Sequence, residues 1–414
     1  QLSENLKNKI SAGEVVERPA SVIKELVENS IDSGADEIKV IVEKGGKQLI
    51  QVSDNGSGIN SKELPIAFER FSTSKISSFE DLYKIDSLGF RGEALASIAS
   101  VSEVKIISKM EDSEGAEMVI NNGISGKVGP AAALKGTSIT VQNLFYNTPA
   151  RRKFLKSPRT EGRKIIAMVR RFALSRPNIG FSLIVDGKKV IDLFPEELED
   201  RIGSLFDNTY KTNLIPIHIS KADYTFTGFV GNLNIVRKRY GEQFLFMNGR
   251  YIKDRLLNSA VYSSYQSLVK RGEYPFFVIN IQIPYEQVDV NVHPMKTEVR
   301  FHDEWRVYHV LKSGVSNALS EILNTIPNFQ KISSESNSFF ENAPQQSSLN
   351  FNSVGQKDPI ISNLDKTDRA KTYASNIVPV DNSSQDFNIE KIWQVHRKYI
   401  ISEINSGLVV IDQH

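Results

Sequence analysis

A short amphipathic helix near the start of the chain constrains what the rest of the chain can fold into. Residues 18–35 read RPASVIKELVENSIDSGA, with Pro19 in the first turn and Gly34 where the chain leaves the helix. Between them, large apolar residues recur at helical spacing and predict one buried face: Val22, Ile23, Leu26, Val27 and Ile31. We therefore predict a half-buried helix whose polar edge points in a fixed direction.

Two polar residues on this edge have functional potential. Glu25 and Asn29 are four residues apart, so their side chains stack one turn above the other. An amide oxygen can ligate a hard cation such as Mg²⁺, and a neighbouring carboxylate can position a water molecule. Solvated polar side chains on an ordinary amphipathic helix give the same pattern. The helix by itself therefore leaves both interpretations open.

A predicted strand that ends in a glycine turn follows the helix. The apolar run at residues 49–52 leads into Asp54, with Gly56 and Gly58 behind it. Glycines let the backbone approach a ligand closely, and the carboxylate of Asp54 can accept a hydrogen bond from an exocyclic amine. An Asp-Asn-Gly turn without a ligand is the alternative.

Two further glycine segments complete a series of four. Residues 87–95 open a predicted helix, and glycines at such a start present free N–H groups that suit phosphate. Gly136 and Thr137 precede a predicted strand at 138–141. Each segment also fits an ordinary loop, but four in this order favour a nucleotide site. The pattern GxxxxGK followed by Ser or Thr does not occur in the sequence.

The order of these segments resembles the four-motif ATP site of the GHKL superfamily. That group includes gyrase-type topoisomerases, the ninety-kilodalton heat-shock chaperone, histidine kinases and the MutL mismatch-repair proteins. Three longer stretches are similar to MutL in particular: residues 11–19, 145–155 and 291–301. The resemblance covers residues 1–330.

The fold class implied by the resemblance is α+β. It comprises a GHKL (Bergerat-type) ATPase sandwich and a second α/β domain of the ribosomal-protein and gyrase transducer type. The apolar pattern also predicts further helices at 61–68, 161–175, 254–270 and 303–326. It predicts strands at 38–42, 49–52, 104–108, 117–121, 137–141, 181–185, 189–192, 224–231, 243–247, 276–283 and 287–292, and extended structure at 392–404 and 407–411. Helices on one face of a mostly antiparallel sheet are what these elements indicate. We expect these domains at residues 1–200 and 201–330. A disordered linker rich in Ser, Asn and Gln is expected at 331–390, followed by the truncated start of a C-terminal dimerisation domain at 391–414.

The resemblance also implies roles for individual residues, with ATP and Mg²⁺ as cofactors. Glu25 orients the attacking water, Asn29 holds Mg²⁺, and Asp54 reads adenine. Lys296 reaches the γ-phosphate from the second domain, where a compact charge can sense the terminal phosphate. The remaining cofactor-binding residues line the adenine or phosphate side: Gly56, Gly58, Thr73, Lys75, Leu88, Gly89, Phe90, Arg91, Gly92, Glu93, Ala94, Leu95 and Thr137.

The implied function is ATP-dependent DNA mismatch repair. We expect a nucleotide-switched matchmaker or clamp that hydrolyses ATP slowly, dimerises when ATP binds and couples mismatch recognition to strand incision. The alternative is a nucleotide-gated DNA-binding adaptor with incidental hydrolysis. A topoisomerase subunit or a histidine kinase is disfavoured, because the chain contains no candidate DNA-cleaving tyrosine module and too few residues precede Glu25 for a phospho-accepting helix.

The expected partners are DNA, a second copy of the chain and a MutS-like mismatch-recognition protein. The formal net charge of +2 is nearly balanced, so a DNA-binding surface must be local. Basic clusters predict phosphate contacts without sequence preference, although a solvated basic face explains each cluster equally well. They contain Arg151, Arg152, Lys153 and Lys156; Arg170 and Arg171; and Arg237, Lys238, Arg239, Arg250, Lys253 and Arg255.

We expect a bacterial cytosolic or nucleoid location and no membrane partner. No apolar run approaches the ~18 residues that a spanning helix needs. The chain also has no cysteine, which excludes disulfides and thiolate ligands. The final residues Asp412, Gln413 and His414 resemble the opening of the metal-binding motif of MutL proteins that nick DNA. We therefore expect metal-dependent nicking only from a full-length version of the chain.

Overall fold

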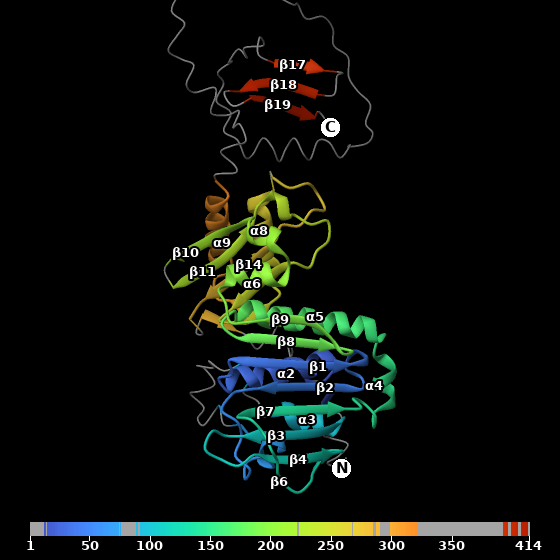
Figure 1. Ribbon diagram of the computed structural model, residues 1–414. Helices are drawn as coiled ribbons and strands as arrows, with labels where there is room; N and C mark the ends of the chain where they lie inside the picture. The colour runs from blue at the N-terminus through green and yellow to red at the C-terminus, as the bar shows by residue number, and fades with distance from the viewer. Residues whose placement is uncertain are drawn as a thin grey trace, which may run out of the picture. The chain divides into compact units, whose positions relative to one another are not determined.

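The computed structural model divides into two compact units, Gln1–Leu323 and Asn324–His414 (Figure 1). Its described residues are 12–13, 15–73, 75, 88–89, 92–221, 223–266, 268–284, 287–289 and 299–320, and, as backbone, 392–395, 399–404 and 407–412. The predicted linker at 331–390 lies outside the described residues. The predicted domain bounds within the first unit stay predictions.

The first unit begins with a nine-stranded, mostly antiparallel sheet. Its strands are β1 (Glu37–Glu43), β2 (Leu49–Asp54), β3 (Glu103–Lys109), β4 (Ala116–Asn121), β5 (Ile124–Ser125), β6 (Gly129–Pro130), β7 (Gly136–Gln142), β8 (Gly180–Val185) and β9 (Lys188–Leu193). The order is β5-β4-β3-β7-β2-β1-β8-β9, with β6 paired to β4. β1 and β8 run parallel, whereas β1 with β2 and β2 with β7 are antiparallel. The strands predicted in this part of the chain are therefore confirmed.

Three helices pack on this sheet and bury one side of its strands. α2 (Pro19–Asp32) contacts β1 and β2, α3 (Ala94–Ser100) contacts β3 and β4, and α5 (Pro158–Ser175) contacts β8 (Figure 1). Alternate residues of β1 are buried beneath them, so the side-chain period of two determines which face carries the core. α4 (Pro149–Phe154) is a short additional helix, and a 3₁₀ turn (Lys44–Gly46) links β1 to β2.

The prediction of a helix over residues 61–68 was wrong. The segment forms turns and a single 3₁₀ turn, Ile66–Phe68. Pro65 lacks the N–H that a continuous helix would need at this position. The buried residues Leu64 and Phe68 anchor the segment from the two sides of this proline.

A five-stranded sheet follows within the same unit. Its strands are β10 (Leu214–Lys221), β11 (Tyr224–Gly231), β12 (Gln243–Met247), β13 (Arg250–Ile252) and β14 (Phe277–Gln282), in the order β10-β11-β14-β12-β13. The helices are α6 (Leu198–Leu205), α7 (Asn208–Lys211), α8 (Arg255–Tyr265) and α9 (Glu304–Ala318), with a 3₁₀ turn at Leu233–Ile235 and a small ribbon of β15 (Val288–Asp289) and β16 (Arg300–Phe301). α8 and α9 pack on each other, and α9 also contacts β10 and β11.

Two features of this sheet differ from the sequence prediction. α8 ends at Tyr265 rather than at residue 270. The sequence analysis did not identify β10, whose Pro216 is tolerated because β10 is an edge strand. The core of the first sheet continues into the second through Phe244, Phe246 and Phe276, so the two sheets share buried apolar contacts.

The second unit contains a three-stranded antiparallel sheet. Its strands are β17 (Ile392–Val395), β18 (Tyr399–Ile404) and β19 (Gly407–Asp412). This confirms the extended structure predicted for these residues. Gln413 and His414 lie outside the described residues, so the possible metal site at the end of β19 stays a prediction.

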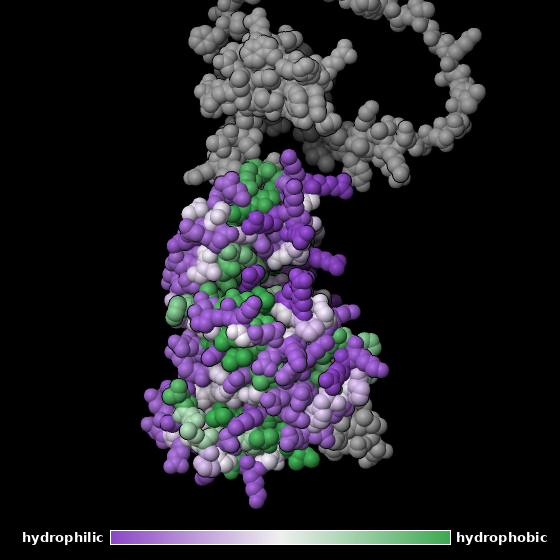
Figure 2. Space-filling view, turned by 45° about the vertical axis from the view of Figure 1, so that its right-hand side comes forward, coloured by the Kyte–Doolittle hydropathy of each residue, from purple (hydrophilic) through white to green (hydrophobic). Residues whose placement is uncertain are grey.

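The face of the first unit seen in Figure 2 is predominantly polar. Figure 2 shows that hydrophilic side chains cover most of the visible face of the first unit, with apolar side chains in small patches. None of the described helices combines the length and the apolar composition that a membrane-crossing segment requires.

Candidate functional site

The site is built on the polar edge of α2. Val22, Ile23 and Val27 are fully buried and fix the rotation of the helix against the sheet. With that face buried, Asn29 and Asp32 lie less than one turn apart on the remaining edge. The predicted helix is therefore confirmed, and it presents the polar edge on which the predicted cation ligand lies.

The carboxylate of Asp54 joins three segments of the fold. Its Oδ2 accepts a hydrogen bond from the Ser30 hydroxyl at 2.7 Å. Its Oδ1 accepts from the backbone N–H of Gly56 at 3.0 Å and from that of Thr137 at 3.2 Å. Three of the predicted residues are thus together in the structure. The sequence analysis missed Ser30, whose signal is its place on the buried side of α2, next to Asn29.

The glycine positions around Asp54 leave no room for a side chain. Gly58 has a φ of +74°, and a Cβ there would lie 2.2 Å from the carbonyl oxygen of Lys109. Gly136 has a φ of +114°, and a Cβ there would lie 2.0 Å from the carbonyl oxygen of Asp54. The turn therefore requires glycine for both conformation and close packing.

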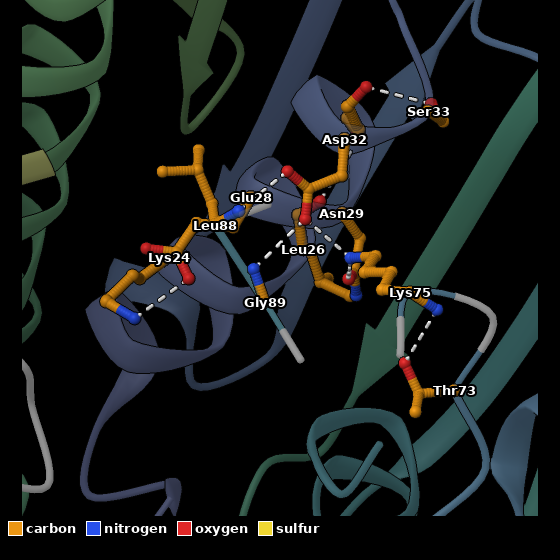
Figure 3. Close-up of polar contacts among 11 residues, drawn as sticks. Lys24, Leu26, Glu28, Asn29, Asp32, Ser33, Thr73, Lys75, Leu88 and Gly89 are labelled. Carbon is orange, nitrogen blue, oxygen red and sulfur yellow. Dashed lines mark hydrogen bonds and ion pairs between the residues drawn. The ribbon is translucent and has the colours of Figure 1, made fainter. Parts of the chain in front are cut away.

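A second cluster gathers around Asp32 (Figure 3). The ammonium of Lys75 donates to Asn29 Oδ1 at 3.0 Å and to Asp32 Oδ2 at 2.6 Å. The backbone N–H groups of Leu88 and Gly89 donate to Asp32 Oδ1 at 2.9 Å and to Oδ2 at 3.0 Å. Three predicted residues therefore converge on a carboxylate that the sequence analysis did not select, and one of them, Lys75, also contacts the predicted Asn29. Its signal was its spacing of three from Asn29 on one helix edge.

Glu25 is charge-paired one turn before Asn29. The Lys24 ammonium lies 2.8 Å from Glu25 Oε1 and 3.0 Å from Glu28 Oε2. Burial alone would lower the pKa of Lys24, but the two carboxylates outweigh that effect and raise it to about 12. Lys24 therefore stays protonated beside Glu25, a partnership that sequence spacing did not reveal.

The other predicted cofactor residues lie on neighbouring segments. The Thr73 hydroxyl accepts the backbone N–H of Lys75 at 3.1 Å. The Thr137 hydroxyl is 2.9 Å from that of Ser108, which fixes the start of β7 against β3. Gly92 and Glu93 directly precede α3, and Ala94 and Leu95 are its first two residues. Phe90, Arg91 and Lys296 lie outside the described residues.

Two of the predicted basic clusters meet at one cavity of about 320 Å³. Arg171 of α5 lines it together with Arg250 of β13 and the neighbouring Lys253, and Lys24 of α2 lines it as well. The guanidinium of Arg171 also stacks on the ring of Tyr251 at 4.2 Å. The tertiary fold thus joins basic residues that are far apart in sequence.

The remaining basic residues differ in their availability. Arg152, Lys153, Lys238, Arg239 and Arg255 are exposed, whereas Arg151 is half-buried. Arg237 is already engaged, because its guanidinium donates to the Tyr210 hydroxyl and lies 3.5 Å from a Glu242 oxygen. These contacts count against Arg237 as a residue that contacts DNA.

The layered sheet, the anchored Asp54 turn and the polar edge of α2 define a GHKL-type ATPase. In agreement, residues 17–144 match the family model described as "Histidine kinase-, DNA gyrase B-, and HSP90-like ATPase". Residues 202–320 match the model "DNA mismatch repair protein, C-terminal domain". The chain belongs to the MutL family of DNA mismatch repair proteins.

The family assignment rests on the similarity of the whole chain to known proteins. The whole chain is 37% identical over 445 residues to "DNA mismatch repair protein MutL" of Flavobacterium psychrophilum, and covers 72% of it. It is 38% identical over 435 residues to the MutL of Geotalea daltonii, again covering 72%. The solved "Aquifex aeolicus MutL ATPase domain complexed with ADP" is 27% identical, with a TM-score of 0.51 over 72% of this chain and 98% of that chain. The predicted fold class, family and ATPase activity are thereby confirmed.

Proposed function

We propose that Asn29 holds Mg²⁺ and that Glu25 orients the water that attacks the terminal phosphate of ATP. The main support is the contact between Asn29 Oδ1 and the ammonium of Lys75 at 3.0 Å, because a protein cation already occupies the position assigned to the metal. Glu25 lies one turn earlier on the same helix. When bound, Mg²⁺ would neutralise charge that develops on the phosphates during transfer.

The donor set fits a magnesium ion that arrives with the nucleotide. The described residues include no group of three or more His, Asp or Glu side chains that could hold a metal alone. Mg²⁺ is commonly held by one or two protein oxygens together with phosphates and water. Asn29 supplies one such oxygen, which is neutral, so the phosphates of the substrate must provide the charged ligands.

The environment of Asp54 supports adenine recognition. A carboxylate has about four acceptor positions, and Ser30, Gly56 and Thr137 occupy three of them. One position is left for an exocyclic amine. A plain Asp-Asn-Gly turn would need only the hydrogen bond to Gly56, so the two additional anchors favour a ligand-binding role.

Phosphate binding is assigned to Lys75 and to the backbone of residues 88–95. The segment carries glycines where close approach is needed, and Lys75 supplies a mobile point charge. Lys296, proposed from the resemblance alone, would sense the terminal phosphate. Its substitution by alanine should then weaken ATP binding more than ADP binding.

At the level of the whole chain, we propose a slow ATPase that acts as a switch in mismatch repair. ATP binding would join two copies of the chain, which would hold DNA through the local basic clusters and respond to a MutS-like recognition protein. Two MutL relatives that the whole chain matches support this role. A nucleotide-gated adaptor with incidental hydrolysis is the alternative. A variant that binds ATP without hydrolysing it distinguishes the two functions, because hydrolysis is required only for the switch.

The deciding experiment is the substitution Glu25→Gln. We expect near-normal affinity for Mg·ATP by calorimetry but a 10²- to 10⁴-fold loss of steady-state phosphate release, the usual range for a lost general base. Glu28→Gln is the matched control, because Glu28 has the same contact to Lys24 on the same helix. Near-normal phosphate release by Glu25→Gln contradicts the assignment.

A further inference from the structure

Asp32 accepts hydrogen bonds from two separate chain segments. Its side chain is 7% exposed and receives the ammonium of Lys75 together with the N–H groups of Leu88 and Gly89 (Figure 3). Lys75 lies 43 residues away in sequence, and Leu88 lies 56 away. A single carboxylate therefore fastens both segments to the end of α2.

Helix stability does not explain an aspartate at this position. Asp32 is the last residue of α2, where the helix dipole disfavours a negative charge. The unfavourable placement is offset by one charge-assisted contact and two backbone hydrogen bonds. These partners, rather than the helix, account for the carboxylate.

The partners of Asp32 are the groups that the proposed function assigns to the nucleotide. Lys75 and the N–H groups of residues 88 and 89 are assigned to phosphate. In this structure they bind the carboxylate of Asp32 instead. Lys75 also lies on Asn29 Oδ1, which is assigned to Mg²⁺. The Lys75 ammonium is therefore the counterpart of the metal cation, and the Asp32 carboxylate is the counterpart of the phosphate anion.

We propose that Asp32 is a positioning residue. Without nucleotide, its carboxylate keeps Lys75 and the N–H groups of Leu88 and Gly89 bound to the protein itself. The inference rests on the proposed function. Asn29 Oδ1 cannot hold a lysine ammonium at 3.0 Å and a magnesium ion at the same time, because the two cations repel and compete for one oxygen. Mg·ATP must therefore displace Lys75 from Asn29, and Asp32 opposes this displacement.

The substitution Asp32→Asn tests the proposal, because it preserves the shape of the side chain and removes its charge. We expect the variant to bind a non-hydrolysable ATP analogue with Mg²⁺ roughly tenfold more tightly than wild type, as when one charge-assisted hydrogen bond no longer has to be broken. The gain in affinity should be smaller with the metal-free analogue in EDTA, because Lys75 then need not leave Asn29. Calorimetry measures both affinities.

Asp36→Asn is the matched control. Asp36 is an exposed aspartate four residues further along the chain, beyond the end of α2. Removing its charge changes the net charge by the same amount and should leave both affinities unchanged. Unchanged or weaker Mg·analogue binding by folded Asp32→Asn overturns the proposal, and so does an equal gain in Asp36→Asn.

A second measurement needs no variant. Hydrogen exchange of the nucleotide-free wild-type chain should show protected amides at Leu88 and Gly89, because both donate to Asp32. Fast exchange of both amides overturns the proposal. If wild type binds no nucleotide at all, the proposed function fails as well; if wild type binds and only Asp32→Asn deviates from expectation, this inference alone fails.

Discussion

At the scale of single residues, the charged groups of the ATP site are paired inside the protein. Lys24 bridges Glu25 and Glu28, and Lys75 bridges Asn29 and Asp32. Each pairing keeps a side chain in place before a ligand arrives, which reduces the ordering that binding must impose. We therefore expect the choice of partners to influence nucleotide affinity as well as stability.

A buried guanidinium beside strands β8 and β9 of the first sheet gives a prediction for stability. Arg201 is fully buried and donates to the carbonyl oxygens of Pro177, Ile179 and Phe194 at 2.7, 3.0 and 2.7 Å. Burial lowers its pKa, and the nearby Glu196 carboxylate opposes that shift. Arg201→Met should lower the free energy of unfolding by roughly 3–5 kcal/mol, because it leaves these acceptors and a carboxylate unpaired.

Chemical denaturation of the whole chain measures this change. Lys211→Met provides the control, because Lys211 forms an ion pair with Asp200 at the protein surface and should matter little. Equal stability of Arg201→Met and Lys211→Met would show that the buried guanidinium has no special structural role.

At the scale of elements, the site depends on where strands end. β2 ends at Asp54 and the antiparallel β7 begins at Gly136, so the sheet register brings a carboxylate and a backbone N–H together. α2 then supplies Ser30 from above the sheet. The proposed adenine side is thus formed where three elements meet rather than by one loop.

Gly136→Ala tests this arrangement. The substitution should cost about 1–3 kcal/mol for the left-handed backbone alone, with an additional penalty from overlap with the Asp54 carbonyl, and should weaken ATP binding. Gly129→Ala is the control, because a Cβ there meets nothing within 4 Å. Thermal unfolding and calorimetry report the two effects, and wild-type behaviour of Gly136→Ala would refute the role assigned to the turn.

At the scale of the whole molecule, nucleotide binding should control association. We expect the mass of the chain in solution to double with a saturating non-hydrolysable ATP analogue and Mg²⁺, because the family resemblance implies a dimer that forms when ATP binds. Asn29→Ala should remain monomeric under the same conditions, since it loses the metal that bridges the phosphates. A wild-type mass that does not change with nucleotide argues against the proposed switch.

DNA binding should depend on salt rather than on sequence. If exposed basic residues contact phosphates, affinity falls steeply between low and physiological salt. The pair of substitutions Arg152→Ala and Lys153→Ala should weaken binding to all sequences and reduce the salt slope by about one per lost contact. Lys62→Ala, at another exposed site, is the control. Affinity that is indifferent to salt would exclude a phosphate-based surface.

The sequence by itself determined the class of protein and most of its site. The helix of residues 19–32, the Asp54 turn and the glycines before α3 are local patterns, and their order along the chain is enough to indicate a GHKL ATPase. Strand periodicity likewise located most of the first sheet. Local patterns failed at residues 61–68, where a proline interrupts the helix, and at β10, where an edge strand tolerates one.

The tertiary structure alone decided which of these groups are partners. The contacts of Asp32 with Lys75 and Leu88, of Ser30 with Asp54, and of Arg201 with its carbonyl acceptors all depend on how distant segments pack. Periodicity shows which side of an element is buried, but it carries no information on which element lies opposite. That information comes from sheet register and helix packing, because these place groups far apart in sequence within hydrogen-bonding distance.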